Sequence, residues 1–242
     1  MSERPNLNSE AEFDPATVPI KPAATVIPIR DSDAGIEVLV LRRDTNLAFH
    51  GGSWVFPGGR LDPGDFEAAG SQNEHDAARF AAVREAKEEA DLDIDIEDLV
   101  ALSHWTTPLG RNRRFSTWFY VVKAPDGVAG EVTVDDGEIR EFEWHTLEAA
   151  ISGCDAGEIM LAGPTYVSLL RLAEHSMVSD ALEATKAGPY EVFEPKIVKG
   201  ADGTSSVYAE DPAYDTGNLD APGPRHRMQM LEKGYRYINE LG

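Results

Sequence analysis

The sequence is poor in cysteine and in basic residues. The first shortage bears on the compartment in which the protein folds, and the second on the partners that it can bind. Its 242 residues include a single cysteine, Cys154, so the chain cannot form an intramolecular disulfide, which is typical of a reducing compartment. Only 22 lysines and arginines stand against 43 acidic residues, which gives a net charge of −21. Because nucleic acids and anionic membranes attract basic surfaces, this balance argues against nonspecific binding to either.

Long apolar runs are also missing. The chain has no run of about 18 apolar residues such as a transmembrane helix needs. Residues 1–20 are polar and acidic, without the basic start and apolar centre of a signal peptide. We therefore expect a flexible N-terminal arm over residues 1–20, and a cytoplasmic protein that binds neither membranes nor nucleic acid. A homodimer is compatible with the sequence.

Apolar periodicity predicts a mixed α/β sandwich. Strands are expected at 24–30, 36–43, 54–56, 99–107, 115–123 and 138–145, with weaker signals at 190–199 and 205–208. Helices are expected from about residue 76, where the apolar stripe is Phe80, Val83, Ala86 and Ala90, and over 147–151, 164–175 and 225–241. Residues 60–75 read as a loop. Strands that alternate with helices in this way favour a sheet covered by helices.

The most informative pattern is a run of acids in a helix-forming stretch. Glu85, Glu88 and Glu89 stand at i, i+3 and i+4, so they share one face of an α-helix. Like charges placed this way repel each other by about 0.2–0.5 kcal/mol per pair. A bound divalent cation would compensate, because carboxylate oxygens are hard ligands. Taken alone, the acids could also form an ordinary solvated helix surface.

A short apolar strand enters the turn Pro57-Gly58-Gly59 about 25 residues before this helix. A Pro-Gly-Gly turn followed by an Arg-Glu-x-x-Glu-Glu helix resembles the Nudix hydrolase family. The resemblance covers residues 21–176, and residues 177–242 form a C-terminal extension. It implies a Nudix-type α/β/α sandwich with a mixed sheet. It also implies a metal-dependent hydrolase that cleaves a diphosphate linkage in a nucleoside diphosphate derivative.

The spacing of the family signature departs from this sequence. Arg84 lies 25 positions after Gly59, where the signature places 14, so an insertion of 11 residues separates the turn from the helix. Counting back from Arg84 instead puts Asp76 at the first glutamate of the signature. Either Asp65 or Asp76 therefore takes the role of that glutamate. Asp91 replaces the glycine that normally ends the helix, and Asp is a workable second choice for a left-handed cap.

The resemblance also implies the residues that perform the chemistry. Glu85, Glu88 and Glu89 would bind Mg²⁺ or Mn²⁺, and the backbone carbonyl of Gly58 would be a further ligand. Arg84 would orient a carboxylate.

The same resemblance implies that the catalytic base comes from an acidic turn later in the chain. Nudix enzymes often take an acid from the region before residue 139 to the metal site. We choose Glu138 as the catalytic base, acting beside Arg84 and Glu88, with Asp135 and Asp136 as alternatives.

Basic and aromatic residues later in the chain are candidates for substrate binding. Arg113 and Arg114 could grip a phosphate through their forked donors, and a surface salt bridge is the alternative. Trp105 could stack on a base, and a place in the core is the alternative.

The segments around Trp54–Gly59 and 103–119 resemble the subfamily related to peroxisomal coenzyme A diphosphatases. Coenzyme A or its thioesters are therefore expected substrates. That subfamily places an arginine where Ala48 stands here, so ADP-ribose or a dinucleotide is the alternative substrate. A non-catalytic domain that senses a nucleotide is a further alternative.

Overall fold

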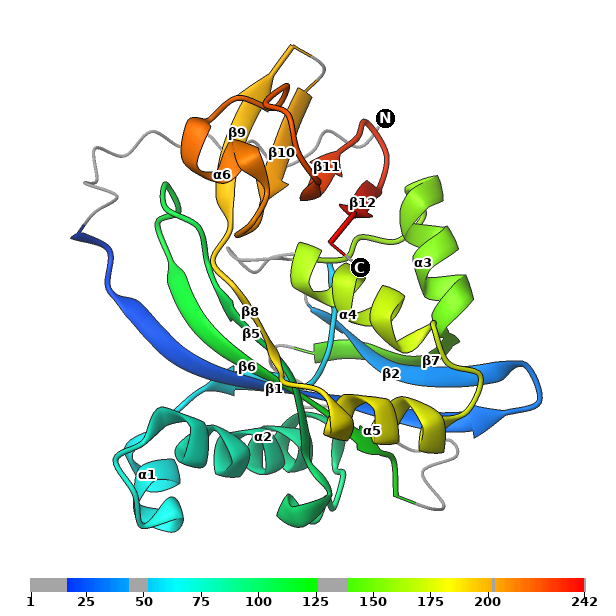
Figure 1. The fold of residues 1–242 in the computed structure, drawn as a ribbon. Coiled ribbons are helices and arrows are strands. Elements are labelled where there is room, and N and C mark those ends of the chain that lie inside the picture. Colours follow the sequence, from blue (N-terminus) through cyan, green and yellow to red (C-terminus); the bar gives the residue numbers. More distant parts are fainter. Residues whose placement is uncertain (1–16, 44–51, 126–138, 202, 242) are drawn as a thin grey trace.

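A mixed β-sheet runs through the centre of the molecule, with helices on both faces (Figure 1). The structure is a computed structural model that describes residues 17–43, 52–125, 139–201 and 203–241. The strands of the main sheet follow the order β3-β2-β1-β6-β5-β8, and β4 and β7 pair with β1 and β2. Their bounds are β1 Ile20–Ser32, β2 Gly35–Arg43, β3 Trp54–Val55, β4 Gly58–Arg60, β5 Val100–Thr106, β6 Arg114–Lys123, β7 Ile139–Thr146 and β8 Glu191–Phe193.

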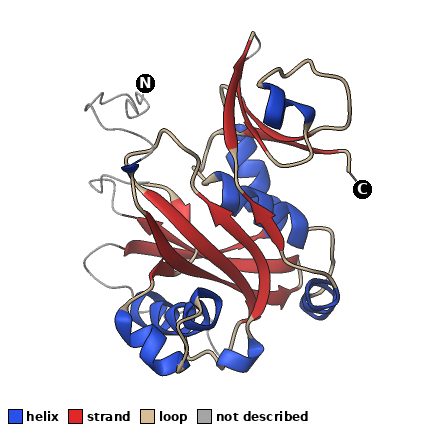
Figure 2. Ribbon diagram, turned by 60° about the vertical axis from the view of Figure 1, so that its left-hand side comes forward, coloured by secondary structure: helices blue, strands red, loops and turns tan. Residues whose placement is uncertain are grey.

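The side chains of the central strands alternate between the two faces of the sheet. Both sets are apolar, so both faces of the sheet are apolar. In β1, Ala24 and Val26 pack on the side of α2, whereas Ile27 and Ile29 belong to a second cluster on the opposite face. Helices α3, α4 and α5 cover that opposite face, with bounds Leu147–Ala156, Gly163–Leu172 and Val178–Ala187 (Figures 1 and 2). The α/β/α sandwich is thereby confirmed.

Helix α2 (Glu74–Ala90) lies close to the sheet because its buried face consists of alanines. These are Ala77, Ala78, Ala81, Ala82, Ala86 and Ala90. Phe80 and Val83 are only half-buried, so the apolar stripe expected from the sequence is corrected to an alanine face. The helix ends at Asp91, whose φ of 48° is left-handed as expected, and the Leu92 N–H donates back to the Ala86 carbonyl.

The loop expected over residues 60–75 contains a helix, α1 (Pro63–Ala69), so that expectation is wrong. Its first turn is closed by the backbone N–H of Asp62, which donates to Asp65 Oδ2 at 2.8 Å. Gly70 ends the helix at a φ of 60°. The inserted residues thus form an ordered element that packs against α2.

The C-terminal extension begins with α5, and its first strand joins the main sheet. Strand β8 pairs in parallel with β5, and the following residues form a second, antiparallel sheet in the order β12-β11-β10-β9 (Figure 2). The bounds are β9 Lys196–Gly200, β10 Gly203–Val207, α6 Pro212–Thr216, β11 His226–Met230 and β12 Tyr235–Asn239. In the described part of the chain, no helix is long and apolar enough to cross a bilayer.

The helix expected over residues 225–241 is wrong, because this segment is the hairpin of β11 and β12. Gly234, at a φ of 62°, lies in the turn between them. The hairpin also contacts the main domain, since the Tyr235 hydroxyl donates to the Leu161 carbonyl at 2.9 Å. The second sheet therefore packs onto the helical layer.

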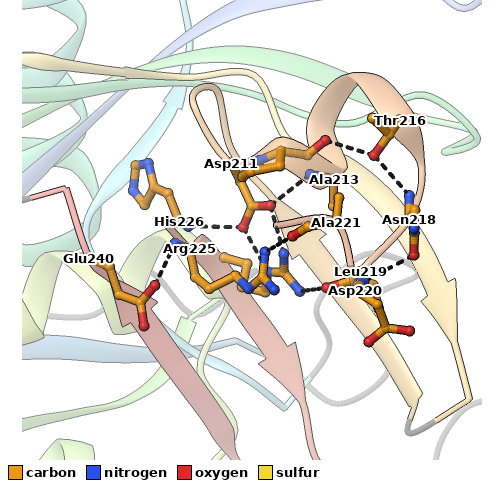
Figure 3. A network of polar contacts seen from close by, with 12 residues as sticks. Asp211, Ala213, Thr216, Asn218, Leu219, Asp220, Ala221, Arg225, His226 and Glu240 are labelled. Atoms are coloured by element: carbon orange, nitrogen blue, oxygen red, sulfur yellow. Dashed lines mark hydrogen bonds and ion pairs between the residues drawn. The ribbon is translucent and has the colours of Figure 1, made fainter. Parts of the chain in front are cut away.

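Asp211 and Arg227 form a buried ion pair at the second sheet, and Figure 3 shows the polar contacts around Asp211. Arg227 donates to both carboxylate oxygens of Asp211 at 2.7 Å, and the side chains are 5% and 0% exposed. Asp211 also accepts the backbone N–H groups of Ala213 and His226. Burial alone would raise the pKa of Asp211, but these hydrogen bonds hold that pKa below its ordinary value. One carboxylate thus joins α6 to β11.

Replacing Arg227 tests how much the ion pair with Asp211 contributes to the free energy of unfolding. We expect Arg227→Met to lower the free energy of unfolding by about 3–5 kcal/mol, because the Asp211 charge stays buried without its partner. Arg236→Met on neighbouring β12 is the matched control: this arginine is exposed, so a change within about 0.5 kcal/mol is expected. Urea denaturation measures both, and equal losses would contradict the assignment.

Candidate functional site

The Pro-Gly-Gly turn lies in close contact with both strand β1 and helix α2. Gly58 and Gly59 pair with Thr25 and Ala24 of β1. A Cβ atom at Gly58 would collide with the Ala24 carbonyl and the Thr25 hydroxyl, and one at Gly59 would collide with the carboxylate of Glu85. Gly58 therefore requires glycine, because backbone atoms leave no space, whereas a side chain at Gly59 would displace the Glu85 carboxylate.

The three glutamates of α2 occupy different environments around this turn. Glu89 accepts the backbone N–H of Gly58 at 2.9 Å. Glu85 lies against Gly59 with its side chain 13% exposed, and burial raises the pKa of its carboxyl against the opposing effect of Arg84. Glu88 is 58% exposed at the outer side. Glu85 and Glu89 thus face the turn directly.

Arg84 connects these carboxylates to helix α1. Its Nη1 donates to Glu85 at 2.8 Å and to Glu88 at 3.1 Å. On its other side, Nε and Nη2 donate to the two oxygens of Asp65 at 3.1 and 3.0 Å. The pKa of Arg84 is raised, first by its hydrogen bond with Asp65. Arg84 therefore contacts three carboxylates, and its role in orienting one of them for the chemistry stays a prediction.

The two candidates for the first glutamate of the signature occupy separate places. Asp65 is 4% exposed and holds Arg84. Asp76 is exposed at the start of α2 and accepts the Ser71 hydroxyl at 2.8 Å. Of the two, only Asp65 is therefore linked through Arg84 to the glutamates of α2, although counting along the sequence pointed to Asp76.

The carboxylates of α2 are oxygen donors of the kind that a hard divalent cation binds. In this arrangement, however, they do not point to one common position. Within the described ranges, no group of three acidic, histidine or cysteine side chains is assembled to hold a metal ion. The guanidinium of Arg84 instead provides the positive charge between Glu85 and Glu88. Oxygen donors on one helix beside a turn without side chains are the set that Mg²⁺ and Mn²⁺ prefer.

Several predicted residues lie outside the described ranges. Glu138, with its alternatives Asp135 and Asp136, precedes β7, and Ala48 lies between β2 and β3. The choice of base and the effect of the missing arginine stay predictions.

Trp105 does not lie at the site, which corrects its predicted role in stacking on substrate. It is 4% exposed, and its ring stacks on Phe193 with centroids 3.8 Å apart. Arg113 is exposed in the loop before β6. Arg114 donates from Nε to the Thr107 carbonyl at 3.0 Å, so part of its fork is used within the chain. Neither arginine is brought to the α2 carboxylates by any described contact.

The fold agrees with known structures. A NUDIX hydrolase from Alicyclobacillus acidocaldarius superposes with a TM-score of 0.65, covering 72% of this chain and 100% of that chain at 23% identity. Among curated sequences, the acyl-coenzyme A diphosphatase NUDT19 of Gallus gallus is 32% identical over 133 residues, which are 50% of this chain and 35% of that protein. The chain spans 25–56% of the length of the curated relatives it matches.

The family itself is shown by a longer match. The NUDIX domain family matches residues 19–160, which is more than half of the chain and includes the turn, α1 and α2. This chain therefore belongs to the Nudix family.

Proposed function

We propose that this chain is a metal-dependent hydrolase that cleaves the diphosphate linkage of a nucleoside diphosphate derivative. The observation that carries the proposal is the contact of α2 with the glycine turn. Glu85 packs on Gly59, and Glu89 accepts the Gly58 N–H, so two carboxylates are held where no side chain separates them from the turn. In the reaction, water adds across one P–O–P bond and two phosphate monoesters leave.

The metal ligands would be Glu85, Glu88 and Glu89 of α2 and the carbonyl oxygen of Gly58 at the start of β4. When bound, Mg²⁺ or Mn²⁺ supplies neutralisation of the phosphate charge and a polarised water. The chain's own groups hold the donors in place: the Gly58 N–H fixes Glu89, and Arg84 fixes Glu85.

The substrate that we favour is coenzyme A or one of its thioesters. The name of the Gallus gallus relative supports this choice. ADP-ribose and dinucleotides are the alternatives, since Ala48 stands where the coenzyme A subfamily has an arginine. A nucleotide-sensing domain without turnover is the rival class, and it is favoured by the contacts of Arg84 with Glu85 and Glu88.

A turnover assay tests the function and the substrate together. Equal concentrations of coenzyme A, ADP-ribose and NADH are incubated with the chain and Mn²⁺, and products are identified by mass. We expect coenzyme A to be consumed first. Glu89→Gln should lose activity by orders of magnitude and stay folded, because its amide oxygen can still accept the Gly58 N–H.

The outcomes separate the hypotheses. Coenzyme A that survives while a rival is consumed would refute the substrate and keep the hydrolase. No turnover of any of the three compounds with Mn²⁺ or Mg²⁺ would refute the hydrolase and favour a sensor.

A second prediction concerns Asp65. We expect Asp65→Asn to lower kcat and Mn²⁺ affinity about 10- to 100-fold, because a charged hydrogen bond contributes about 1.5–3 kcal/mol and this one positions Arg84. Asp76→Asn is the matched control, and it should stay within about twofold because Asp76 contacts only the α1–α2 connection in this region. Calorimetric titration with Mn²⁺ and steady-state kinetics give the two readouts. A loss in Asp76→Asn alone would reverse the assignment.

A third prediction concerns the base. Glu138→Gln should lower kcat more than it raises KM, since a proton acceptor acts mainly in the transition state. Asp135→Asn and Asp136→Asn are made in parallel. If either of these loses activity while Glu138→Gln keeps it, the base lies in the acidic pair instead.

A further inference from the structure

The strand register places a second group of residues level with the glycine turn. Gly59, Ala24, Trp118 and His104 are successive ladder partners across β4, β1, β6 and β5. Paired residues point to the same face of a sheet, and Ala24 and Trp118 both pack on the side of α2. Strands lie about 4.8 Å apart, so three steps set His104 roughly 14 Å from Gly59.

Four aromatic side chains gather around this end of the register, and we call them the aromatic platform. They are His75, His104, Trp118 and Tyr190. Trp118 is central: its ring centroid is 4.3 Å from that of His75, 4.5 Å from His104 and 4.9 Å from Tyr190. His75 stacks on Tyr190 with an interplanar angle of 22°. The four rings come from α2, β5, β6 and the C-terminal extension. The platform is therefore complete only in the whole chain.

The platform combines an exposed ring with polar groups. Tyr190 is 43% exposed, whereas Trp118 beneath it is 8% exposed. A ring nitrogen of His104 lies 2.8 Å from the Ser116 hydroxyl. Nε2 of His75 is buried and has no hydrogen-bond partner among the described residues. The exposed ring of Tyr190, supported by the rings packed beneath it, offers a surface on which a flat heterocycle can stack.

The local charge favours an uncharged ligand group over phosphate. Burial lowers the pKa of both His75 and His104, so both rings are neutral near pH 7. The acidic groups that act on His104 are Glu74 and Glu194, and His75 feels Asp76 together with one cation, Arg79. A phosphate would be repelled by those acids, whereas a nucleobase carries no charge.

We propose that the aromatic platform binds the base of the substrate's nucleoside, with the base stacked on Tyr190. The inference rests on the proposed function, because it places the diphosphate at the α2 carboxylates and the base about three strands away. The ribose and its phosphate connect the two positions. Tyr190 directly precedes β8, so the extension contributes the outermost ring of the site.

Two probes test the base separately from the sugar phosphate. AMP and ribose 5-phosphate are titrated calorimetrically into the full chain. Tyr190→Ala should weaken AMP binding about tenfold, from the loss of base stacking, and leave ribose 5-phosphate unchanged. Tyr190→Phe should restore AMP binding, because the ring and not the hydroxyl stacks. Tyr214→Ala on α6 is the control for loss of a tyrosine elsewhere, and it should match the parent.

Results that refute base binding at the aromatic platform differ from results that refute the proposed hydrolase. Unchanged AMP binding in Tyr190→Ala, or equal losses for AMP and ribose 5-phosphate, would overturn the platform even if a diphosphate is hydrolysed. The expected AMP pattern without any turnover would uphold the platform and refute the hydrolase.

Discussion

The contacts of Arg84 are the interaction on which the rest of the site depends. One guanidinium holds Asp65 of α1, Glu85 and Glu88 of α2, and the carbonyl of Arg60 at the end of β4. Three elements therefore meet at a single cation. Because Asp65 is buried and Arg84 is 27% exposed, water screens this contact less than a surface pair, and losing either partner would leave charge without compensation. The insertion between turn and helix is thereby joined to the acids that it separates in sequence.

A second constraint is steric. The alanine face of α2 brings the helix so near the sheet that the Glu85 carboxylate reaches Gly59 and occupies the space that a Cβ atom would need there. Larger residues on this face would lift the helix and withdraw Glu85 and Glu89 from the turn. The position of Glu85 and Glu89 therefore depends on both the alanines of α2 and the glycines of the turn, although helix α1 separates them in the sequence. The acids can face the turn only while both are kept.

The sequence alone predicts the elements that have strong local patterns. It does not predict the elements whose conformation depends on pairing with other parts of the chain. Helix α2 and strands β1, β2, β5 and β6 follow from periodicity. Helix α1 was missed because acidic and glycine residues resemble a loop, although Asp62, Asp65 and Gly70 are its caps. The sequence of the β11–β12 hairpin predicts a helix, because its residues gain strand character only from pairing. The choice between Asp65 and Asp76, and the burial of Trp105, depended on contacts that no count along the chain contains. The base, Glu138, lies outside the described residues and stays a prediction.

The extension belongs to the main fold, because its first strand and its aromatic residues complete the sheet. Strand β8 covers the edge of β5, and Phe193 stacks on Trp105 while Tyr208 meets the same indole edge-on. Without these residues, the β5 edge and a large apolar ring would face solvent. The Asp211–Arg227 pair holds β11 and α6 together behind that contact. The residue before β8, Tyr190, then lies over Trp118. The same strand pairing that closes the core thus sets the position of the exposed ring on the α2 side of the sheet.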